Sequence, residues 1–451
     1  MPETQPHPEH EPVYDVVGIG FGPSNLALAI ALEEHNEALG GEQALTGVFL
    51  ERKQSFGWHR GMLIEGATMQ VSFLKDLATL RNPVSRFAFV SYLHDKGRLV
   101  DFINQKSFFP TREEFHDYLE WAASDVDHMV RYDSEVVSVR PVIEGGADGA
   151  ATLFEVVSRD PGSDEETVHR ARNIVVACGL EAVMPDGVTA SERVWHSGSL
   201  LTNLAELKDD APKRFVVVGA GQSAAEATEY LHRTHPHAEV CAVLSRFGYS
   251  PADDSPYANR VFDPEAVDVW FDAPEPVRDR LMDYHRNTNY SVVDLDLIVD
   301  LYRTEYQEKV RGEHRLRILR ASRVTGVSEQ ATGVVVHLED LPAEARKELD
   351  ADVVVFATGY RPFEPTGLLG DAGRHCVRDE QGRLGITRDY RVRTDSAVRA
   401  GIYVQGGTEH THGITSSLLS MVAVRSGEIL ASIVEQRDRQ ADPAADAGKK
   451  P

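Results

Sequence analysis

Glycines at two places in the chain have the spacing of a backbone turn that binds the phosphates of a dinucleotide. The first turn contains Gly18, Gly20 and Pro23, between an apolar run at 13–17 and a helix-like stretch. Glycine lets the backbone approach a pyrophosphate, and the positive end of the following helix stabilises its charge. Proline suits a first helical turn, where its missing N–H costs nothing. Glu51 ends a second apolar run and can accept hydrogen bonds from ribose hydroxyls, so this turn fits FAD.

The second turn follows an apolar run at 214–218. Its predicted nucleotide-binding residues are Gly219, Ala220, Gly221, Gln222 and Ser223. The next apolar run leads to Arg246 instead of an acid. An acid would repel a 2′-phosphate, whereas arginine can pair with it, so this turn fits NADPH better than NADH. The alternative is that Arg246 is a solvated surface charge.

The elements that must position these turns are short β-branched runs alternating with amphipathic stretches, which predicts an α/β fold with parallel sheets. Apolar runs at 173–179 and 352–360 end in small-residue turns, and we expect the chain to cross between domains near them. The prediction is two Rossmann-like domains, for FAD and NADPH, and a small, partly helical substrate-binding region. The expected divisions are a disordered 1–11, FAD-binding parts at 12–205 and 359–437, an NADPH-binding domain at 206–358 with a substrate-contacting insertion at about 250–310, and a disordered tail at 438–451.

Composition limits the classes of partner. The 451 residues are 42% apolar and 26% charged, which is typical of a globular protein. No apolar run reaches the roughly 20 residues that span a bilayer, and the polar N-terminus lacks the apolar core of a signal peptide, so we expect a cytoplasmic protein. A net charge of −24 would repel nucleic acids and anionic membranes, which leaves a small molecule as the partner.

An FAD domain and an NADPH domain together fit several reaction classes. A disulfide reductase needs a redox cysteine pair, but the three cysteines, Cys178, Cys241 and Cys376, lie far apart in sequence and form no CxxC motif. The same spacing predicts no metal site. A single-component monooxygenase fits, since there NADPH reduces the flavin and the flavin then activates O2. A nucleotide-binding protein that senses NADPH without turnover is a distant alternative.

Several motifs in this order carry a more specific resemblance. They are the glycine turn at 18–23, Trp58 with His59, the segment 69–77 (MQVSFLKDL), the segment 287–291 (NTNYS), the ATGY at 357–360 and the THG at 411–413. Over about residues 12–435 the chain resembles the microbial N-hydroxylating monooxygenases, specifically the L-ornithine N5-monooxygenases of siderophore biosynthesis. The resemblance implies that N5-hydroxyornithine, the product, becomes an iron-binding hydroxamate.

The resemblance also implies roles for individual residues. Residues expected at FAD are Gly18, Gly20, Pro23, Glu51, Trp58, His59, Gln70, Val136, Ser417, Leu418 and Leu419. Residues expected at the substrate are Lys75, Asn259, Arg260, Val261, Phe262, Asn289 and Ser420, with Lys75 holding the substrate carboxylate. Asn289, Tyr290 and Ser291 are also expected at the nicotinamide half of NADPH.

The implied reaction transfers one oxygen atom from a C4a-hydroperoxyflavin to the neutral side-chain amine of L-ornithine. No side chain stands out as a general acid or base. L-Lysine N6-hydroxylation and diamine hydroxylation remain alternatives, because one methylene changes binding by only about 1–3 kcal/mol. A diamine offers Lys75 no carboxylate, which favours an amino acid. The resemblance suggests a homotetramer.

Overall fold

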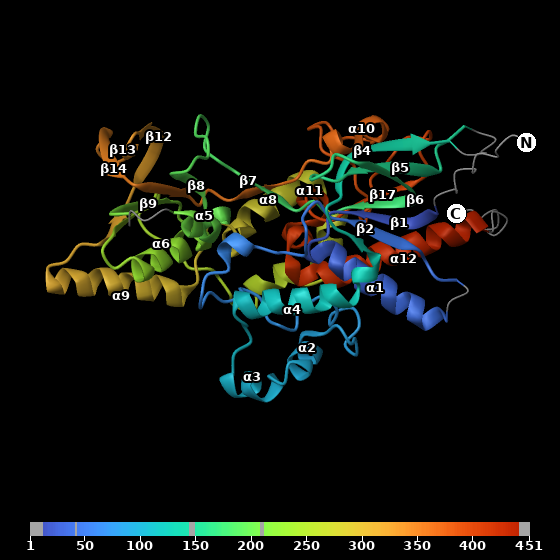
Figure 1. Cartoon of the computed structure of the whole chain (residues 1–451), viewed down its shortest axis with the longest axis horizontal. Helices are drawn as coiled ribbons and strands as arrows, with labels where there is room; N and C mark the ends of the chain where they lie inside the picture. The colour runs from blue at the N-terminus through green and yellow to red at the C-terminus, as the bar shows by residue number, and fades with distance from the viewer. Residues whose placement is uncertain (1–11, 41–42, 144–148, 208–211, 442–451) are drawn as a thin grey trace, which may run out of the picture.

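The computed structural model describes residues 12–40, 43–143, 149–207 and 212–441 of the chain. Figure 1 shows two α/β units side by side along the longest axis, with β1, β6 and α12 in one and β9, α6 and α9 in the other. The residues predicted to be disordered at 1–11 lie outside the described ranges. None of the helices in these ranges is long and apolar enough to cross a membrane.

The first unit is built on a seven-stranded sheet of strand order β3-β2-β1-β6-β5-β4, to which β17 adds by pairing with β6. Pairing is parallel from β3 to β6 and at β17, and antiparallel along β6-β5-β4. The strands are β1 (Val13–Ile19), β2 (Gly47–Leu50), β3 (Val130–Arg131), β4 (Glu135–Val142), β5 (Leu153–Arg159), β6 (Glu166–Val176) and β17 (Gly401–Val404).

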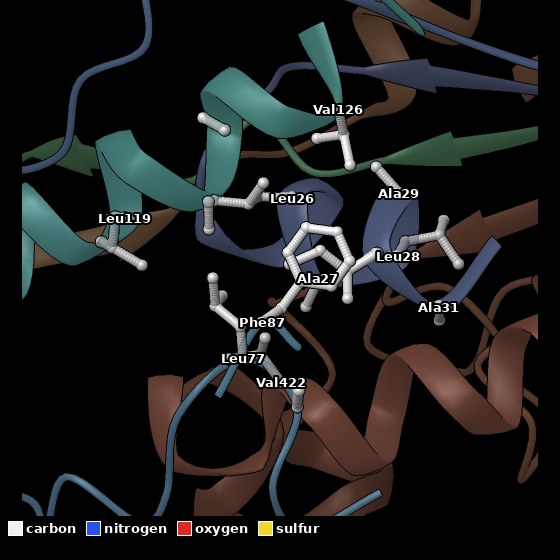
Figure 2. Close-up of a cluster of buried hydrophobic side chains, with 14 of the residues drawn as sticks. Leu26, Ala27, Leu28, Ala29, Ala31, Leu77, Phe87, Leu119, Val126 and Val422 are labelled. Atoms are coloured by element: carbon white, nitrogen blue, oxygen red, sulfur yellow. The ribbon is translucent and has the colours of Figure 1, made fainter. Parts of the chain in front are cut away.

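Helix α1 (Pro23–Leu39) lies at the centre of this unit. Its residues 25–32 are all buried, because α4 (Arg112–Asp125) and α12 (Val422–Ala441) cover the sides that the sheet does not. Figure 2 shows Leu26 and Ala27 of α1 in one apolar cluster with Leu119 of α4, Val422 of α12 and Phe87 of a loop. A helix that is apolar on all sides is buried on all sides, which explains the position of α1 in the core.

The second unit is a five-stranded, all-parallel sheet of order β11-β10-β9-β15-β8. A three-stranded antiparallel sheet, β12-β13-β14, packs beside it. The strands are β8 (Val194–His196), β9 (Arg214–Val218), β10 (Glu239–Val243), β11 (Leu316–Leu319), β12 (Ser322–Gln330), β13 (Gly333–Asp340), β14 (Ala345–Ala351) and β15 (Val353–Phe356). Helix α6 (Gln222–Thr234) follows β9 directly, as α1 follows β1.

The remaining helices connect or cover the units. In chain order they are α2 (Phe89–Asp95), α3 (Leu99–Gln105), α5 (Leu200–Glu206), α7 (Ala266–Asp272), α8 (Glu275–His285), α9 (Leu295–Arg311), α10 (Thr366–Gly373) and α11 (Glu409–His412). The last part of the predicted insertion is α9, which packs on α6 of the second unit, whereas α7 contacts α11 of the first.

Two predicted boundaries are wrong. The chain crosses between units through the antiparallel pair β7 (Leu180–Ala182) and β16 (Tyr360–Pro362), and β8 already pairs with β15. The second unit therefore starts well before the predicted boundary at 206. The sequence analysis did not place β8 in this unit, because a strand of three residues can be assigned to a sheet only from the strand it pairs with, here β15. Helix α12 continues to Ala441, so residues 438–441 are helical and only 442–451 of the predicted tail lie outside the described ranges.

Candidate active site

A cavity of about 810 Å³ opens where β1, β2 and β6 end. Nine of the eleven residues predicted at FAD gather around it, although they come from distant parts of the chain. These lining residues are Gly20, Pro23, Glu51, Trp58, His59, Val136, Ser417, Leu418 and Leu419. Two predicted FAD residues lie elsewhere: Gly18 is inside β1, where an added Cβ would be 2.1 Å from the Phe49 ring, and the Gln70 side chain is exposed.

The glycine turn forms one wall of this cavity. Gly20 has a φ of +82°, and a Cβ there would lie 2.7 Å from the carbonyl oxygen of Ala177. Gly22 is the N-cap of α1 and makes no side-chain cap hydrogen bond, so the N–H groups of the first helical turn remain available as donors. A Cβ on Gly22 would meet nothing within 4 Å. The turn thus offers open space and free donors, which fits a pyrophosphate.

Glu51 stands beside the turn with its carboxylate fixed by backbone donors. Its Oε2 accepts from the N–H of Phe21 at 2.8 Å, and its Oε1 accepts from the N–H of Lys53 at 3.0 Å. A carboxylate has about four acceptor positions, so two remain for a ribose diol in the cavity. The N–H donors of the turn and the acceptor oxygens of Glu51 therefore fit the adenosine half of FAD.

His59 contributes an uncharged polar group to the lining of the cavity. Much of its surface is accessible, but that surface faces the cavity, and protein encloses the rest of the ring. This burial, with the positive charges of Arg112 and Lys53, lowers the pKa of His59 to about 4. The imidazole is therefore neutral near pH 7 and can donate or accept one hydrogen bond per nitrogen.

The predicted NADPH residues also gather, at the second turn. Gly219 has a φ of +145°, and a Cβ there would lie 2.5 Å from the carbonyl oxygen of Ala357. Gly221 is the N-cap of α6, again without a side-chain cap, and a Cβ on it would approach Ser291 to 3.5 Å. Arg246 donates to the carbonyl oxygen of Ser291 at 2.9 Å. The turn, the arginine and the segment 289–291 thus form one site, and Ala220 and Ser223 belong to the same turn and first helical turn.

The amide of Gln222 is engaged within the protein. Its Nε2 donates to Glu226 at 2.9 Å, and its Oε1 accepts from the N–H of Asp294 at 2.8 Å. Gln222 therefore connects the second glycine turn to the chain that follows Ser291.

The substrate segment Asn259 to Phe262 forms a 3-10 helix whose two ends differ in environment. Val261 and Phe262 pack with Trp270 and Ile414, next to the wall at Ser417. Asn259 and Arg260 are exposed and pair locally: Asn259 donates to the carbonyl oxygen of Asp254 at 2.9 Å, and Arg260 lies 3.2 Å from Asp263. The structure packs the apolar pair against Ile414, three residues before the cavity residue Ser417, and leaves the polar pair on the surface.

Glu409 joins this insertion to the first unit. It accepts hydrogen bonds from the hydroxyl of Tyr290 and, at 2.7 Å, from that of Ser417. Burial and the Glu409 charge raise the pKa of Tyr290 above its usual range, so the phenol remains a donor. The sequence analysis missed Glu409, since its two partners lie 119 and 8 residues away along the chain.

Lys75 and Ser420 are not among the residues that line the cavity. Lys75 is half-buried, and within the described part of the chain its ammonium forms no ion pair. Ser420 is buried directly after the lining residues Leu418 and Leu419. The three cysteines are free; Cys178 lines the cavity, and Cys241 and Cys376 are buried. Among the described residues, no cluster of three metal-ligating side chains occurs.

Comparisons with known proteins agree with this geometry. An L-ornithine N(5)-monooxygenase of Burkholderia cepacia is 40% identical over 96% of this chain and 97% of its own. The structure of an ornithine N-hydroxylase of Kutzneria sp. 744, solved with reduced FAD, NADP+ and L-ornithine, superposes with a TM-score of 0.89 at 49% identity, covering 94% of this chain and all of that one. The ornithine hydroxylase of Pseudomonas aeruginosa superposes with a TM-score of 0.87 at 38% identity, with coverage of 94% and 100%. Residues 12–362 match the profile of the L-lysine 6-monooxygenase/L-ornithine 5-monooxygenase family. The chain belongs to this family.

Proposed function

We propose that the chain is an L-ornithine N5-monooxygenase, which uses FAD, NADPH and O2 to convert L-ornithine to N5-hydroxyornithine. The observation that carries the proposal is a cavity that fits FAD, linked through Glu409 to the insertion that also lies at the second glycine turn. The first glycine turn and Glu51 line the cavity, and the second turn lies beside Arg246 and Ser291. Glu409 accepts hydrogen bonds from the cavity residue Ser417 and from Tyr290, which directly precedes Ser291. Two relatives that match nearly the whole chain are named for this reaction, an L-ornithine N(5)-monooxygenase and an ornithine N-hydroxylase.

Each part has a role in the reaction. FAD, once reduced by NADPH, supplies the oxygen chemistry. The residues of the chain bind and orient: Lys75 pairs with the substrate carboxylate, and Asn289 and Ser420 hydrogen-bond to the other polar groups of the substrate. The side-chain amine must be neutral to accept oxygen, although the pKa of such an amine is about 10.4 in water. A closed, low-polarity site lowers this pKa by desolvation.

The choice of ornithine over lysine depends on the length of the site. The family profile covers both substrates, and one methylene is worth only about 1–3 kcal/mol. The 49% identity to an ornithine N-hydroxylase favours ornithine. The Lys75 ammonium, which forms no ion pair among the described residues, favours an amino acid over a bare diamine.

We further propose a homotetramer in the cytoplasm that serves a hydroxamate siderophore pathway or a related one. Light scattering on the purified holoenzyme would measure the assembly. A product that binds ferric iron after acylation would support the pathway.

The decisive experiment measures hydroxylated product with ornithine, lysine, putrescine and cadaverine under NADPH and O2. We expect a yellow protein that forms hydroxylamine from ornithine, with the other three amines giving at least tenfold less. If ornithine stimulates NADPH oxidation but yields only hydrogen peroxide, the proposal is wrong. A flavoprotein that binds NADPH but does not oxidise it would instead support the alternative of a protein that senses NADPH.

A further inference from the structure

A fully buried arginine lies beneath the cavity. Arg425, in the first turn of α12, is 2% exposed. Its guanidinium donates to Gln405 Oε1 at 3.1 Å, to Ser24 Oγ at 3.1 Å and to the carbonyl oxygen of Ser416. All three acceptors are neutral, so the hydrogen bonds satisfy the guanidinium without neutralising its charge.

The nearby carboxylate does not supply this neutralisation. Glu428 lies close enough to favour the charged form of Arg425, but both its oxygens accept from Arg388, each at 2.9 Å. Burial lowers the pKa of Arg425, which reflects the cost of holding a cation away from water. Such a charge is strongly destabilising unless an anion compensates it.

The hydrogen bonds of Arg425 lead to the first glycine turn. Ser24 lies in the first turn of α1 and lines the cavity. Gln405, the second partner, donates to the carbonyl oxygen of Ser24 and to Asn25 Oδ1, both at 3.1 Å. Asn25 in turn donates to the carbonyl oxygen of Gly20 at 2.7 Å. Arg425 therefore supports the backbone that is shaped for a pyrophosphate.

The Ser24 hydroxyl can carry the effect of the charge into the cavity. Its oxygen accepts from Arg425, which leaves its own O–H to donate. A donor polarised by a cation forms a stronger hydrogen bond to an anion. The third partner, Ser416, directly precedes the wall residues Ser417 to Leu419, so the same guanidinium holds both sides of the cavity.

We propose that Arg425 is a positioning residue for FAD, whose buried charge compensates the pyrophosphate through the Ser24 hydroxyl. The inference rests on the proposed function only in that FAD occupies this cavity. The consequence is a difference in stability between two states. The buried cation destabilises the apoprotein, and bound FAD removes this destabilisation.

The test compares Arg425→Met and Arg425→Lys with the wild type, using apoprotein titrated with FAD and thermal unfolding with and without FAD. Arg425→Met removes the charge and keeps an apolar side chain of similar length, and we expect it to weaken FAD binding by about 10- to 100-fold. The Tm of its apoprotein should stay equal to or above that of the wild type, while the rise in Tm on adding FAD shrinks. Arg425→Lys should restore part of the affinity. Ser24→Ala should also weaken FAD binding, and its effect should not add to that of Arg425→Met.

Arg388→Met is the matched control, since Arg388 is a partly buried arginine of the same region whose charge Glu428 already pairs. It should lower the Tm of the apo and FAD-bound forms equally and change FAD affinity by no more than about twofold. Arg425→Met with wild-type FAD affinity would overturn the inference, as would equal Tm losses in both forms. If Arg425→Met does not fold, Ser24→Ala and Arg425→Lys decide by the same criteria. A wild type that binds no FAD would overturn the proposed function instead.

Discussion

At the scale of single residues, Lys75 owes its position to its neighbour Asp76. The buried Asp76 carboxylate accepts from the N–H groups of Ala78 at 2.9 Å, Thr79 at 2.6 Å and Phe89 at 2.7 Å. These bonds fix the backbone next to residue 75, and among the described residues no carboxylate pairs with the half-buried Lys75 side chain. In the proposed function, this ammonium pairs with the carboxylate of the substrate.

We predict that Lys75→Ala raises the KM for ornithine by about 10- to 100-fold, since it removes a charge-assisted hydrogen bond. Anaerobic flavin reduction by NADPH should stay within about twofold of the wild type. Stopped-flow absorbance and a hydroxylamine assay measure the two effects. The exposed Lys106 is the control, and Lys106→Ala should change neither. An equal loss of flavin reduction in Lys75→Ala would remove Lys75 from the substrate site.

His412 is a buried histidine whose neutral form is satisfied by its neighbours. It is fully buried, stacks on Tyr390 at 4.3 Å, and bonds the carbonyl oxygen of Arg388 at 3.1 Å and Thr411 Oγ at 2.7 Å. Burial lowers its pKa from 6.5 to about 4, although the bond to Arg388 opposes the shift. The unfolded chain thus takes up a proton near pH 6.5, whereas the folded chain does so only near pH 4.

This difference predicts that the free energy of unfolding falls as the pH falls, because the neutral form of His412 is favoured only in the folded chain. The stabilisation by neutral His412 is fully present above pH 6.5 and is lost between pH 6.5 and about 4, and the total loss is about 3 kcal/mol. Thermal unfolding of His412→Gln across this range should therefore show a flatter fall in Tm than the wild type. His128, which is exposed, is the control, and His128→Gln should follow the wild-type curve. Parallel curves for His412→Gln and wild type would contradict the prediction.

At the scale of elements, the two glycine turns are built in the same way. Gly20 follows β1 and faces the carbonyl oxygen of Ala177, just beyond β6; Gly219 follows β9 and faces that of Ala357, just beyond β15. In each sheet the strand that approaches the glycine is the parallel neighbour of the strand that leads into the turn. A side chain at either position would separate the turn from this neighbour.

Gly20→Ala should therefore lower stability and FAD content together. The positive φ alone costs about 1–2 kcal/mol, and the approach to 2.7 Å of a backbone oxygen adds to it. Gly40→Ala tests the cost of the positive φ alone, since Gly40 has a φ of +68° at the end of α1 and a Cβ there meets nothing within 4 Å. We expect Gly40→Ala to lose only the conformational term and to keep its FAD, as measured by flavin absorbance and denaturant unfolding. Full FAD content in Gly20→Ala would show that the turn can shift to accept a side chain.

At the scale of the whole molecule, one buried ion pair joins the two units. Arg112, at the start of α4, donates to both oxygens of Glu226 in α6, at 3.0 and 2.7 Å, and also to the carbonyl oxygen of Met62 at 2.9 Å. Glu226 accepts in addition from Gln222, which is part of the second glycine turn. The pair therefore links α4 of the first unit to the helix that follows the second glycine turn.

Arg112→Ala should cost about 3–5 kcal/mol of stability, because it leaves the Glu226 carboxylate buried and unpaired. We also expect at least about a tenfold slower flavin reduction by NADPH, since a displacement of 1 Å can cost more than this. Arg233→Ala is the control: Arg233, also in α6, pairs across the units with Glu65, but both side chains are exposed. It should change stability by less than about 1 kcal/mol and leave reduction unchanged. Equal effects of the two variants would mean that the buried pair does not position the turn.

The sequence alone determined the two dinucleotide turns, their order along the chain and the α/β class. These features are local: a strand, a glycine turn and a helix follow one another within about 20 residues, and steric limits on φ restrict which residues fit. The acid at Glu51 and the arginine at Arg246 were predicted for the same reason, since each follows within three residues of the end of the next strand.

Only the tertiary structure decided which distant groups meet. Arg112 and Glu226 are 114 residues apart, and Arg425 and Ser24 are 401 residues apart, so no local pattern relates them. The assignment of β8 to the second sheet and the contact of Glu409 with Tyr290 depend likewise on how the chain crosses between units. From the sequence alone, a charged residue such as Arg425 is predicted to lie on the surface. Burial makes it costly, and packing alone decides where that burial occurs.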